Sequence, residues 1–424
     1  MPTLSQKLFS MSKQTSFACL SLLCFCLADV KDGLGPFLGV YLQSMNWRPD
    51  EIGFVMTAGG LAELAAAAPF GALADSARHK RGLIAASILI ITAACGLVFL
   101  SSSAPAAALS KVLSSLAAAA IAPALASLTL GMTGQAGLPL RLGKNEAWGH
   151  AGNAATALLG GLIGLLWGIP GVFAVMACMG LIAAAALCGI NPAHIDYAAA
   201  RGLASEPQSQ TSAAHAGRIR ILFSDKALLV VGGTLFFFHL GNAAMLPLLG
   251  QSAVAQFDAD PAAYTAGTVL LAQATMIVAA LLGAHAAEKK GYAPLFYAAL
   301  IALPIRGCIA GFWENPWNLI PVQILDGVGA GLLGVATPGI VARILVGSGR
   351  INLGLGFVLT IQGFGAAFSN AYGGLFAQHA GYGSAFLALA LAPCAGLLLF
   401  EIGKRRLPRL QAALTSASKP SCAS

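Results

Sequence analysis

The sequence predicts an all-α membrane protein with 12 transmembrane helices in two pseudo-symmetric six-helix bundles. First, 57% of the 424 residues are hydrophobic and only 9% are charged, whereas a soluble domain has about 45–50% apolar and about 25% charged residues. Second, the apolar residues form blocks of about 20, the length that a helix needs to cross a bilayer. Third, the two halves of the chain repeat each other.

The predicted spans are apolar blocks separated by short polar stretches. The first, Phe17 to Gln43, follows Lys7 and Lys13 like a signal peptide, but it is too long and contains acidic residues, so we keep it as a span. The first half holds spans at roughly 17–43, 51–74, 82–102, 105–132, 146–168 and 170–190, and the second at roughly 227–250, 264–287, 292–312, 317–342, 351–376 and 382–403.

A polar stretch between the two halves of the chain predicts where the domain boundaries lie. Residues 191–226 are rich in Ala, Ser and Gln and carry no apolar stripe, which is typical of a linker. We therefore predict an N-terminal bundle over 1–190, a cytoplasmic linker over 191–226, a C-terminal bundle over 227–406 and a cytoplasmic tail over 407–424. The tail is short and is expected to be disordered.

The Lys and Arg residues predict the orientation, because cytoplasmic loops carry an excess of these residues. With a cytoplasmic N-terminus, the outward loops hold only Arg48. The inward loops then hold Arg78, Lys80, Arg81, Arg141, Lys144, Arg201, Arg218, Arg220, Lys226, Lys289, Lys290, Arg343, Arg350 and Lys404 to Arg406. Both termini are therefore expected in the cytoplasm. Because these charges are spread over short loops, the net charge of +8 does not indicate a nucleic-acid partner.

Several classes of site are absent from the sequence. The nine cysteines form no CxxC pair, so neither a disulfide framework nor a metal site is predicted, and no cofactor is expected. The motifs HExxH, GxSxG and GxxxxGK[ST] do not occur, which argues against a membrane-embedded enzyme and against a pump driven directly by ATP.

The internal repeat pairs polar residues of the two halves. Asp29-x-x-Asp32 of the first span corresponds to His239-x-x-Asn242 of the seventh at an offset of 210 residues. The segment 71–75 corresponds to 283–287 at an offset of 212, and the glycine pair 160–161 to 373–374 at an offset of 213, as a duplication with small insertions would produce. An offset of 212 places Lys111 opposite Gln323, and Ser114 opposite Asp326. Six-helix repeats related by a pseudo-twofold axis are one transporter architecture.

These features resemble the major facilitator superfamily. The loop after the second span, GALADSARHKRGLI, is similar to the family's signature G-x-L-a-D-r-x-G-r-k, although Ser76 and Arg78 depart from it. The fourth span, SKVLSSLAAAAIAP, is similar to the family's R-x-x-Q-G pattern, with Lys111 at the basic position. The fifth span lacks the proline motif of the family's drug–proton antiporters.

The resemblance implies a conformational gate at the signature loop. Its residues are Gly71, Asp75, His79, Lys80 and Arg81 together with Arg350. Asp75 is expected near the start of the eleventh span, where the helix N-terminus and Arg350 both attract a negative charge.

The resemblance also implies that spans 1, 4, 7 and 10 line a central cavity. The polar residues within these spans are Asp29, Asp32, Lys111, His239, Asn242 and Asp326. Ionised side chains are costly inside a bilayer and normally face a protein interior or a water-filled path. Asp29 and Asp32 share a helix face and cannot both ionise cheaply, so either is a candidate proton carrier. Counting helix rise suggests that Asp29, Lys111, His239 and Asp326 share one depth.

Some of these residues have an alternative structural interpretation. Asp326 could instead pair with Arg306 of the ninth span and only hold helices together. His239 could relay a proton or serve as a hydrogen-bonded packing residue. Glu63 lies near mid-membrane with no evident partner.

The predicted function is secondary active transport of a small polar or charged solute by alternating access, coupled to protons. The protein is expected to act as a monomer in a bacterial inner membrane, with the lipid bilayer, protons and a small-molecule substrate as its partners. An efflux antiporter for drugs or metabolites is the alternative, and import and export are not distinguished by any feature of the sequence.

Overall fold

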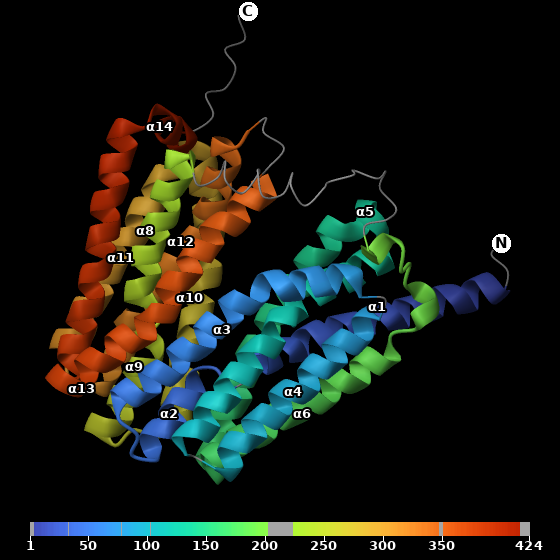
Figure 1. The fold of residues 1–424 in the computed structure, drawn as a ribbon, viewed down its shortest axis with the longest axis horizontal. Helices are drawn as coiled ribbons and strands as arrows, with labels where there is room; N and C mark the ends of the chain where they lie inside the picture. Colours follow the sequence, from blue (N-terminus) through green and yellow to red (C-terminus); the bar gives the residue numbers. More distant parts are fainter. Residues whose placement is uncertain are drawn as a thin grey trace, which may run out of the picture. The chain divides into compact units, whose positions relative to one another are not determined.

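The computed structural model describes residues 4–32, 34–77, 79–101, 103–201, 224–346 and 351–415. These residues form helices and turns and contain no strand (Figure 1), which confirms the predicted all-α class. The helices are α1 (Leu4–Asp32), α2 (Pro36–Ser44), α3 (Pro49–Ser76), α4 (Lys80–Leu100), α5 (Ala104–Trp167), α6 (Ile169–Gly189), α8 (Lys226–Asn242), α9 (Met245–Phe257), α10 (Pro261–Lys290), α11 (Ala293–Phe312), α12 (Leu319–Ile344), α13 (Ile351–Arg406) and α14 (Pro408–Leu414).

The helices account for every predicted span. Ten segments of the described chain are long and apolar enough to cross a membrane. One of them contains both the eleventh and the twelfth predicted spans, which α13 joins through Gly381 at φ 84°. The fifth predicted span is the second part of α5, beyond Gly134 at φ 68°, and it is not among these ten segments. Positive φ values suit glycine, so these two residues turn the chain between consecutive spans.

The first and seventh predicted spans are each broken into two helices, and the hydrophobic pattern does not predict these breaks. After α1, Gly35 adopts φ 48° and Pro36 opens α2, where a missing N–H costs nothing. After α8, Pro247 cannot donate to the carbonyl of Ala243, which weakens the helix there. The breaks fall directly after Asp32 and Asn242, which the internal repeat places at equivalent positions.

Large apolar side chains cover the outer surface of the helices. Leu100 is 83% exposed, Leu89 and Leu281 are 70% exposed, and Leu391 is 68% exposed. A soluble monomer rarely exposes extended apolar patches, because they drive association in water. Lipid tails solvate such side chains, so this surface fits a protein surrounded by a bilayer.

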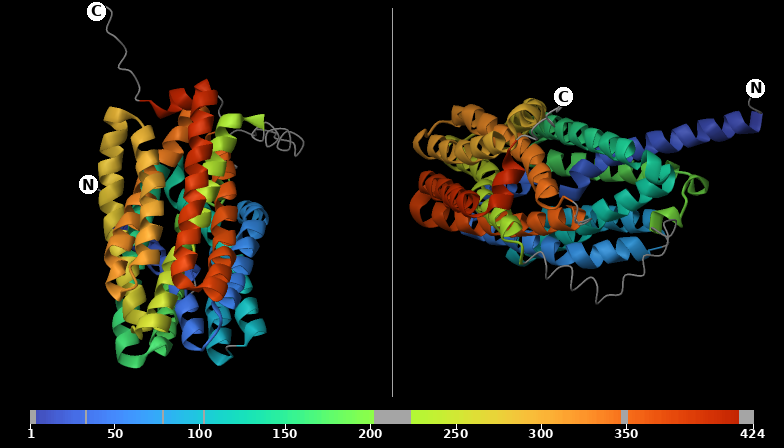
Figure 2. Two further views of the ribbon diagram at one scale, coloured as in Figure 1. Left: turned by 90° about the vertical axis from the view of Figure 1, so that its left-hand side faces the viewer. Right: turned by 90° about the horizontal axis from the view of Figure 1, so that it is seen from above.

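The chain forms two compact units. Unit 1 comprises residues 1–45, 58–208 and 260–266, and unit 2 comprises 46–57, 209–259 and 267–424. Within unit 1, α5 packs against α1 and α4; within unit 2, α13 packs along α8 and α11 (Figure 2). The domain boundaries expected from the sequence stay a prediction.

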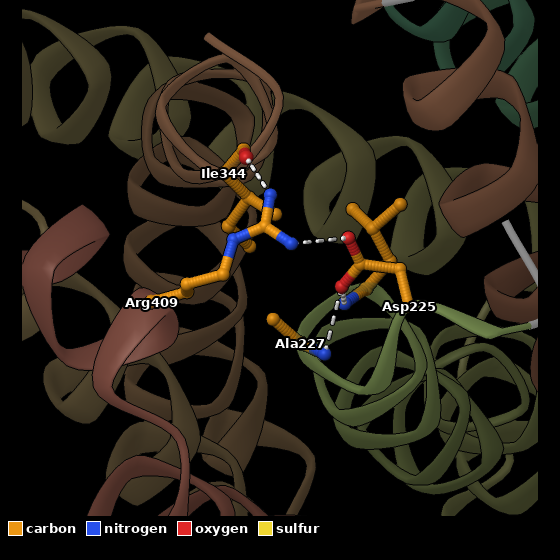
Figure 3. Close-up of polar contacts among 5 residues, drawn as sticks. Asp225, Ala227, Ile344 and Arg409 are labelled. Atoms are coloured by element: carbon orange, nitrogen blue, oxygen red, sulfur yellow. Dashed lines mark hydrogen bonds and ion pairs between the residues drawn. The ribbon is translucent and has the colours of Figure 1, made fainter. Parts of the chain in front are cut away.

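The segment after Arg406, expected to be disordered, forms the short helix α14 up to Leu414, which docks on unit 2. Arg409 donates to the carbonyl of Ile344 at the end of α12 over 3.0 Å, and pairs with Asp225 over 3.4 Å. Asp225 also caps α8 by accepting from the N–H of Ala227 (Figure 3). A single guanidinium therefore joins α14 to the ends of two other helices.

The apolar face of α14 explains why it docks. Leu410, Ala413 and Leu414 are at most 3% exposed. Arg343 donates to the carbonyl of Ala413 and lies over the ring of Tyr292, 4.4 Å from its centroid. Burial of these apolar side chains offsets the cost of ordering a seven-residue helix.

We expect Arg409→Ala to lower the melting temperature of the purified protein in detergent, because both of its bonds are lost. The pair is partly exposed, so the expected cost is about 1 kcal/mol, a shift of a few degrees. The control is Arg405→Ala, since Arg405 is 76% exposed and pairs only within its own helix. Equal shifts in both variants would contradict a stabilising role for α14.

Candidate functional site

Two acidic side chains lie on the last turns of α1. Asp32 is the final residue of α1, and its side chain is 55% exposed. Lys31 is its nearest cation, at 4.0 Å from Nζ to Oδ1. Asp29, one turn earlier, is partly buried, and its Oδ2 is fully buried without a hydrogen-bond partner among the described residues. Both carboxylates are thus poorly neutralised, which is costly in a membrane.

Lys111 reaches toward these acids from α5. Its stem crosses α3 at Gly59, where a Cβ would lie 2.6 Å from Cγ and 2.9 Å from Cε of the lysine. Glu63, one turn further along α3, lies within electrostatic range of Lys111 and Asp32. Lys111 also interacts electrostatically with Asp32. The absence of a side chain at Gly59 therefore allows Lys111 to lie across α3, near both acids.

These residues form a charged cluster in unit 1, which we call the acidic cluster: Asp29, Lys31, Asp32, Glu63 and Lys111. The electrostatic interactions connect Asp29 to Asp32, and Asp32 and Glu63 to both lysines. Lys31–Asp32 is its one ion pair within 4 Å among the described residues. With three carboxylates and two ammonium groups, the cluster carries a formal charge of −1 if all are ionised.

Unit 2 contains a second polar cluster, in which the charges are paired directly. Arg306 of α11 is fully buried and its Nη1 lies 2.9 Å from Oδ1 of Asp326 on α12. The same nitrogen donates to Oδ1 of Asn242, the last residue of α8. The alternative considered for Asp326, an ion pair with Arg306, is therefore observed. We call Asn242, Arg306, Gln323 and Asp326 the amide–guanidinium cluster.

His239 lies one turn before Asn242 on α8 and is partly buried. Its ring contacts that of Phe238 edge-on, with centroids 5.2 Å apart. No hydrogen bond of its imidazole occurs among the described residues. Its assignment as a proton relay stays a prediction.

The basic residues of the signature loop hold helix ends within unit 1. Lys80 is fully buried, and its Nζ donates to the carbonyl of Ala74 near the end of α3. Arg81 donates to the carbonyls of Leu187 and Cys188 at the end of α6, over 3.1 and 3.3 Å. A cation at a helix C-terminus interacts favourably with the helix dipole and with the unpaired carbonyls.

The other residues of the predicted gate are only partly described. His79 is exposed immediately before α4, and Gly71 lies in α3 with open space where a Cβ would point. Arg350 and the side chain of Asp75 lie outside the described part of the chain. The expected contact between Asp75 and the helix that follows Arg350 therefore stays a prediction.

Three contributors to the two clusters could not be identified from the sequence. Nothing in the sequence distinguishes Gly59 or gives Glu63 a partner, and the sequence indicates Arg306 only as a possible partner of Asp326. The proximity of Glu63 to Lys111 depends on the close approach of α3 to α5 at Gly59, which residue spacing does not reveal. The chain has 50 glycines, so the sequence alone does not distinguish Gly59 from the others.

Comparison with known proteins places these features in a family. The model of the Major Facilitator Superfamily matches residues 20–305. Two uncharacterised MFS-type transporters of Mycobacterium tuberculosis, from strains CDC 1551 and H37Rv, are each 37% identical over 387 residues, which covers 90% of this chain and 91% of the relative.

Solved structures of transporters share the fold. A mutant of the nucleoside transporter NupG superposes with a TM-score of 0.75 at 17% identity, covering 92% of this chain and 99% of that one. A bacterial homologue of the human lysosomal transporter Spinster gives 0.70 at 13% identity over 95% and 97%. The D-xylose–proton symporter gives 0.67 at 11% identity over 92% and 97%. The extent of the family match and the identity to the mycobacterial relatives show that this chain belongs to the major facilitator superfamily, a family of multi-pass membrane transporters rather than enzymes.

Proposed function

We propose that this transporter moves a small polar solute by alternating access and couples that movement to protons through the acidic cluster. The observation that carries the proposal is the charge imbalance of that cluster, three carboxylates against two ammonium groups with a single ion pair at 4.0 Å among the described residues. A fixed excess charge is costly in a membrane. Binding one proton removes the excess, so the cluster supports reversible protonation.

Lys111 gives the cluster a means to link the proton to the solute. Lys111 interacts electrostatically with both Asp32 and Glu63, and it forms a direct ion pair with neither acid. A polar solute that hydrogen-bonds one carboxylate would change which acid Lys111 neutralises, and therefore which acid holds the proton. Asp32, 55% exposed, is the more accessible carrier, and Asp29 is the second choice.

The orientation and the gate belong to the same proposal. The Lys and Arg distribution supports cytoplasmic termini in a bacterial inner membrane. The signature loop, with Gly71, Asp75, His79, Lys80, Arg81 and Arg350, would then control access at the cytoplasmic side. The bonds of Lys80 and Arg81 to helix-end carbonyls support a role in holding that side of unit 1 rigid.

The proposal is tested by transport in proteoliposomes containing the purified protein. A panel of radiolabelled sugars, nucleosides, amino acids and small carboxylates is offered with and without an imposed proton gradient. At least one solute should accumulate with the gradient and equilibrate without it. Uptake that is the same under both conditions would contradict proton coupling, and no uptake of any solute would contradict the substrate class.

Gly59→Ala should impair transport while leaving the protein folded. The added methyl would meet Cγ and Cε of Lys111, so the flexible lysine must leave its path across α3. We expect the initial rate of gradient-driven uptake to fall by at least about tenfold, because misplacing a positioned group by about 1 Å can cost about a hundredfold. The control is Gly96→Ala in α4, where nothing lies within 4 Å of the new methyl. Equal rates in both variants would show that the position of Lys111 is unimportant.

Cysteine labelling tests the orientation. A single cysteine in place of Ser209, in a background without native cysteines, should react with an impermeant maleimide only after the membrane is opened, because the linker is expected in the cytoplasm. Ser209 lies outside the described residues, so the test is independent of the structure. Labelling in intact cells would reverse the proposed orientation.

A further inference from the structure

The amide–guanidinium cluster of unit 2 contains buried polar atoms that have no partner among the described residues. They are Nε and Nη2 of Arg306 and both amide atoms, Nε2 and Oε1, of Gln323. Both side chains are 0% exposed. Buried polar groups are hydrogen-bonded in more than about 90% of cases, and an unsatisfied one costs about 1–3 kcal/mol. Four such atoms in one region indicate a place for a hydrogen-bonding group.

We place these atoms in one region because Asp326 contacts Arg306 and lies one helical turn from Gln323. Gln323 and Asp326 are three residues apart on α12, which places them on the same helix face. Arg306 contacts that face through its 2.9 Å ion pair with Asp326. Asn242 and Asp326 are only partly buried, so the cluster has an open side.

The inventory of free groups defines the chemistry of the occupant. Arg306 offers N–H groups on Nε and Nη2, and Gln323 offers an NH₂ group and one carbonyl oxygen. Donors therefore outnumber acceptors, and an oxygen that accepts hydrogen bonds fits best. Asp326 already neutralises Arg306, so a carboxylate or phosphate would bring an uncompensated negative charge beside that acid. A hydroxyl or carbonyl group carries no such penalty.

We propose that Arg306 and Gln323 form a subsite for an uncharged, oxygen-bearing part of the solute, such as the hydroxyl groups of a sugar or nucleoside. This inference rests on the proposed function and narrows its substrate class. The internal repeat supports a division of roles, because Gln323 corresponds to Lys111 and Asn242 to Asp32. Unit 1 carries ionisable side chains at these positions, and unit 2 carries neutral amides.

Binding to the purified protein tests the subsite with matched probes. The pairs are D-xylose with D-xylonate, uridine with uridine 5′-monophosphate, and glycerol with glycerol 3-phosphate, measured by calorimetry in detergent. At least one uncharged probe should bind at least tenfold more tightly than its anionic partner. Binding by none of the uncharged probes, or tighter binding by the anions, would overturn the proposal.

Gln323→Met assigns the effect to the subsite. It replaces an unpaired buried amide by an apolar side chain of similar size, so the melting temperature should not fall. Binding of the uncharged probe should weaken at least tenfold. The control is Gln251→Met in α9, a buried amide whose Oε1 is also unpartnered among the described residues. Binding by the Gln323 variant that equals wild type would mean that the amide serves ordered water only, and would overturn the proposal.

Two further measurements test the subsite if the Gln323 variant does not fold, and distinguish failure of the subsite from failure of the proposed function. If the Gln323 variant does not fold, single-deoxy analogues of the bound probe are tested on the wild-type protein. At least one analogue should bind tenfold more weakly, and equal binding by every analogue would contradict the subsite. Counterflow in proteoliposomes separates the two proposals. Transport of anionic probes alone would refute the subsite but not proton-coupled transport, whereas binding of an uncharged probe without its transport would refute only the proposed function.

Discussion

Arg306→Met should be among the most destabilising single substitutions in this protein. Arg306 is fully buried and neutralises Asp326 over 2.9 Å, and it also donates to Asn242. Breaking a buried ion pair by removing one partner costs about 3–5 kcal/mol, because the remaining charge is left uncompensated. Equilibrium unfolding in mixed micelles would measure this loss.

A double variant distinguishes the effect of an uncompensated charge on stability from the effect of altered packing. Arg306→Met combined with Asp326→Leu removes both charges, so most of the lost stability should return. The control for loss of an arginine as such is Arg405→Met, whose ion pair with Glu401 is solvent-exposed and should contribute less than about 1 kcal/mol. If the single variant at Arg306 were as stable as wild type, the ion pair would have no structural role.

Asp32→Asn should abolish gradient-driven accumulation while leaving exchange of solute across the membrane. After the substitution, two carboxylates face two ammonium groups in the acidic cluster, so the cluster is neutral without a bound proton. With one proton per solute, a gradient of one pH unit supplies about tenfold accumulation. The accumulation ratio of the variant should fall to about 1, and counterflow should persist.

Two comparisons sharpen this prediction. Asp29→Asn changes the charge of the cluster in the same way. If Asp29→Asn lost accumulation and Asp32→Asn did not, the proton carrier would be Asp29 instead of Asp32. Asp258→Asn is the control, because Asp258 is exposed and adopts a left-handed conformation that asparagine tolerates. Full gradient-driven transport by both Asp29→Asn and Asp32→Asn would move the coupling role to Glu63 or Asp326, or indicate a uniporter.

The length and hydrophobicity of the spans sufficed to predict the all-α fold class. They could not predict where helices continue or break. The chain turns at Gly134 and Gly381 within helices that were expected to be separate. Conversely, the expected first span breaks at Gly35 and Pro36. This break results from the backbone geometry of these two residues, and the hydrophobicity of the span does not indicate it. Pro36 was visible in the sequence, but a proline can begin, kink or end a membrane helix, so its effect depended on the packing around it.

The candidate site was predictable in its residue types and not in its pairings. Ionisable residues within apolar spans stand out in a sequence, which is why Asp29, Asp32, Lys111 and Asp326 could be chosen. Whether such a charge is paired depends on contacts between distant helices. Asp326 is held by Arg306 of a neighbouring helix, whereas Lys111 depends on a glycine of another helix.

Solute-driven proton movement tests proton-coupled transport most directly. A solute identified by uptake is added to lightly buffered proteoliposomes, and the external pH is followed with a dye. We expect a pH change that begins with solute entry, disappears with a protonophore and is absent in Asp32→Asn, although that variant still exchanges solute. Solute entry into wild-type proteoliposomes without any proton movement would contradict proton-coupled transport.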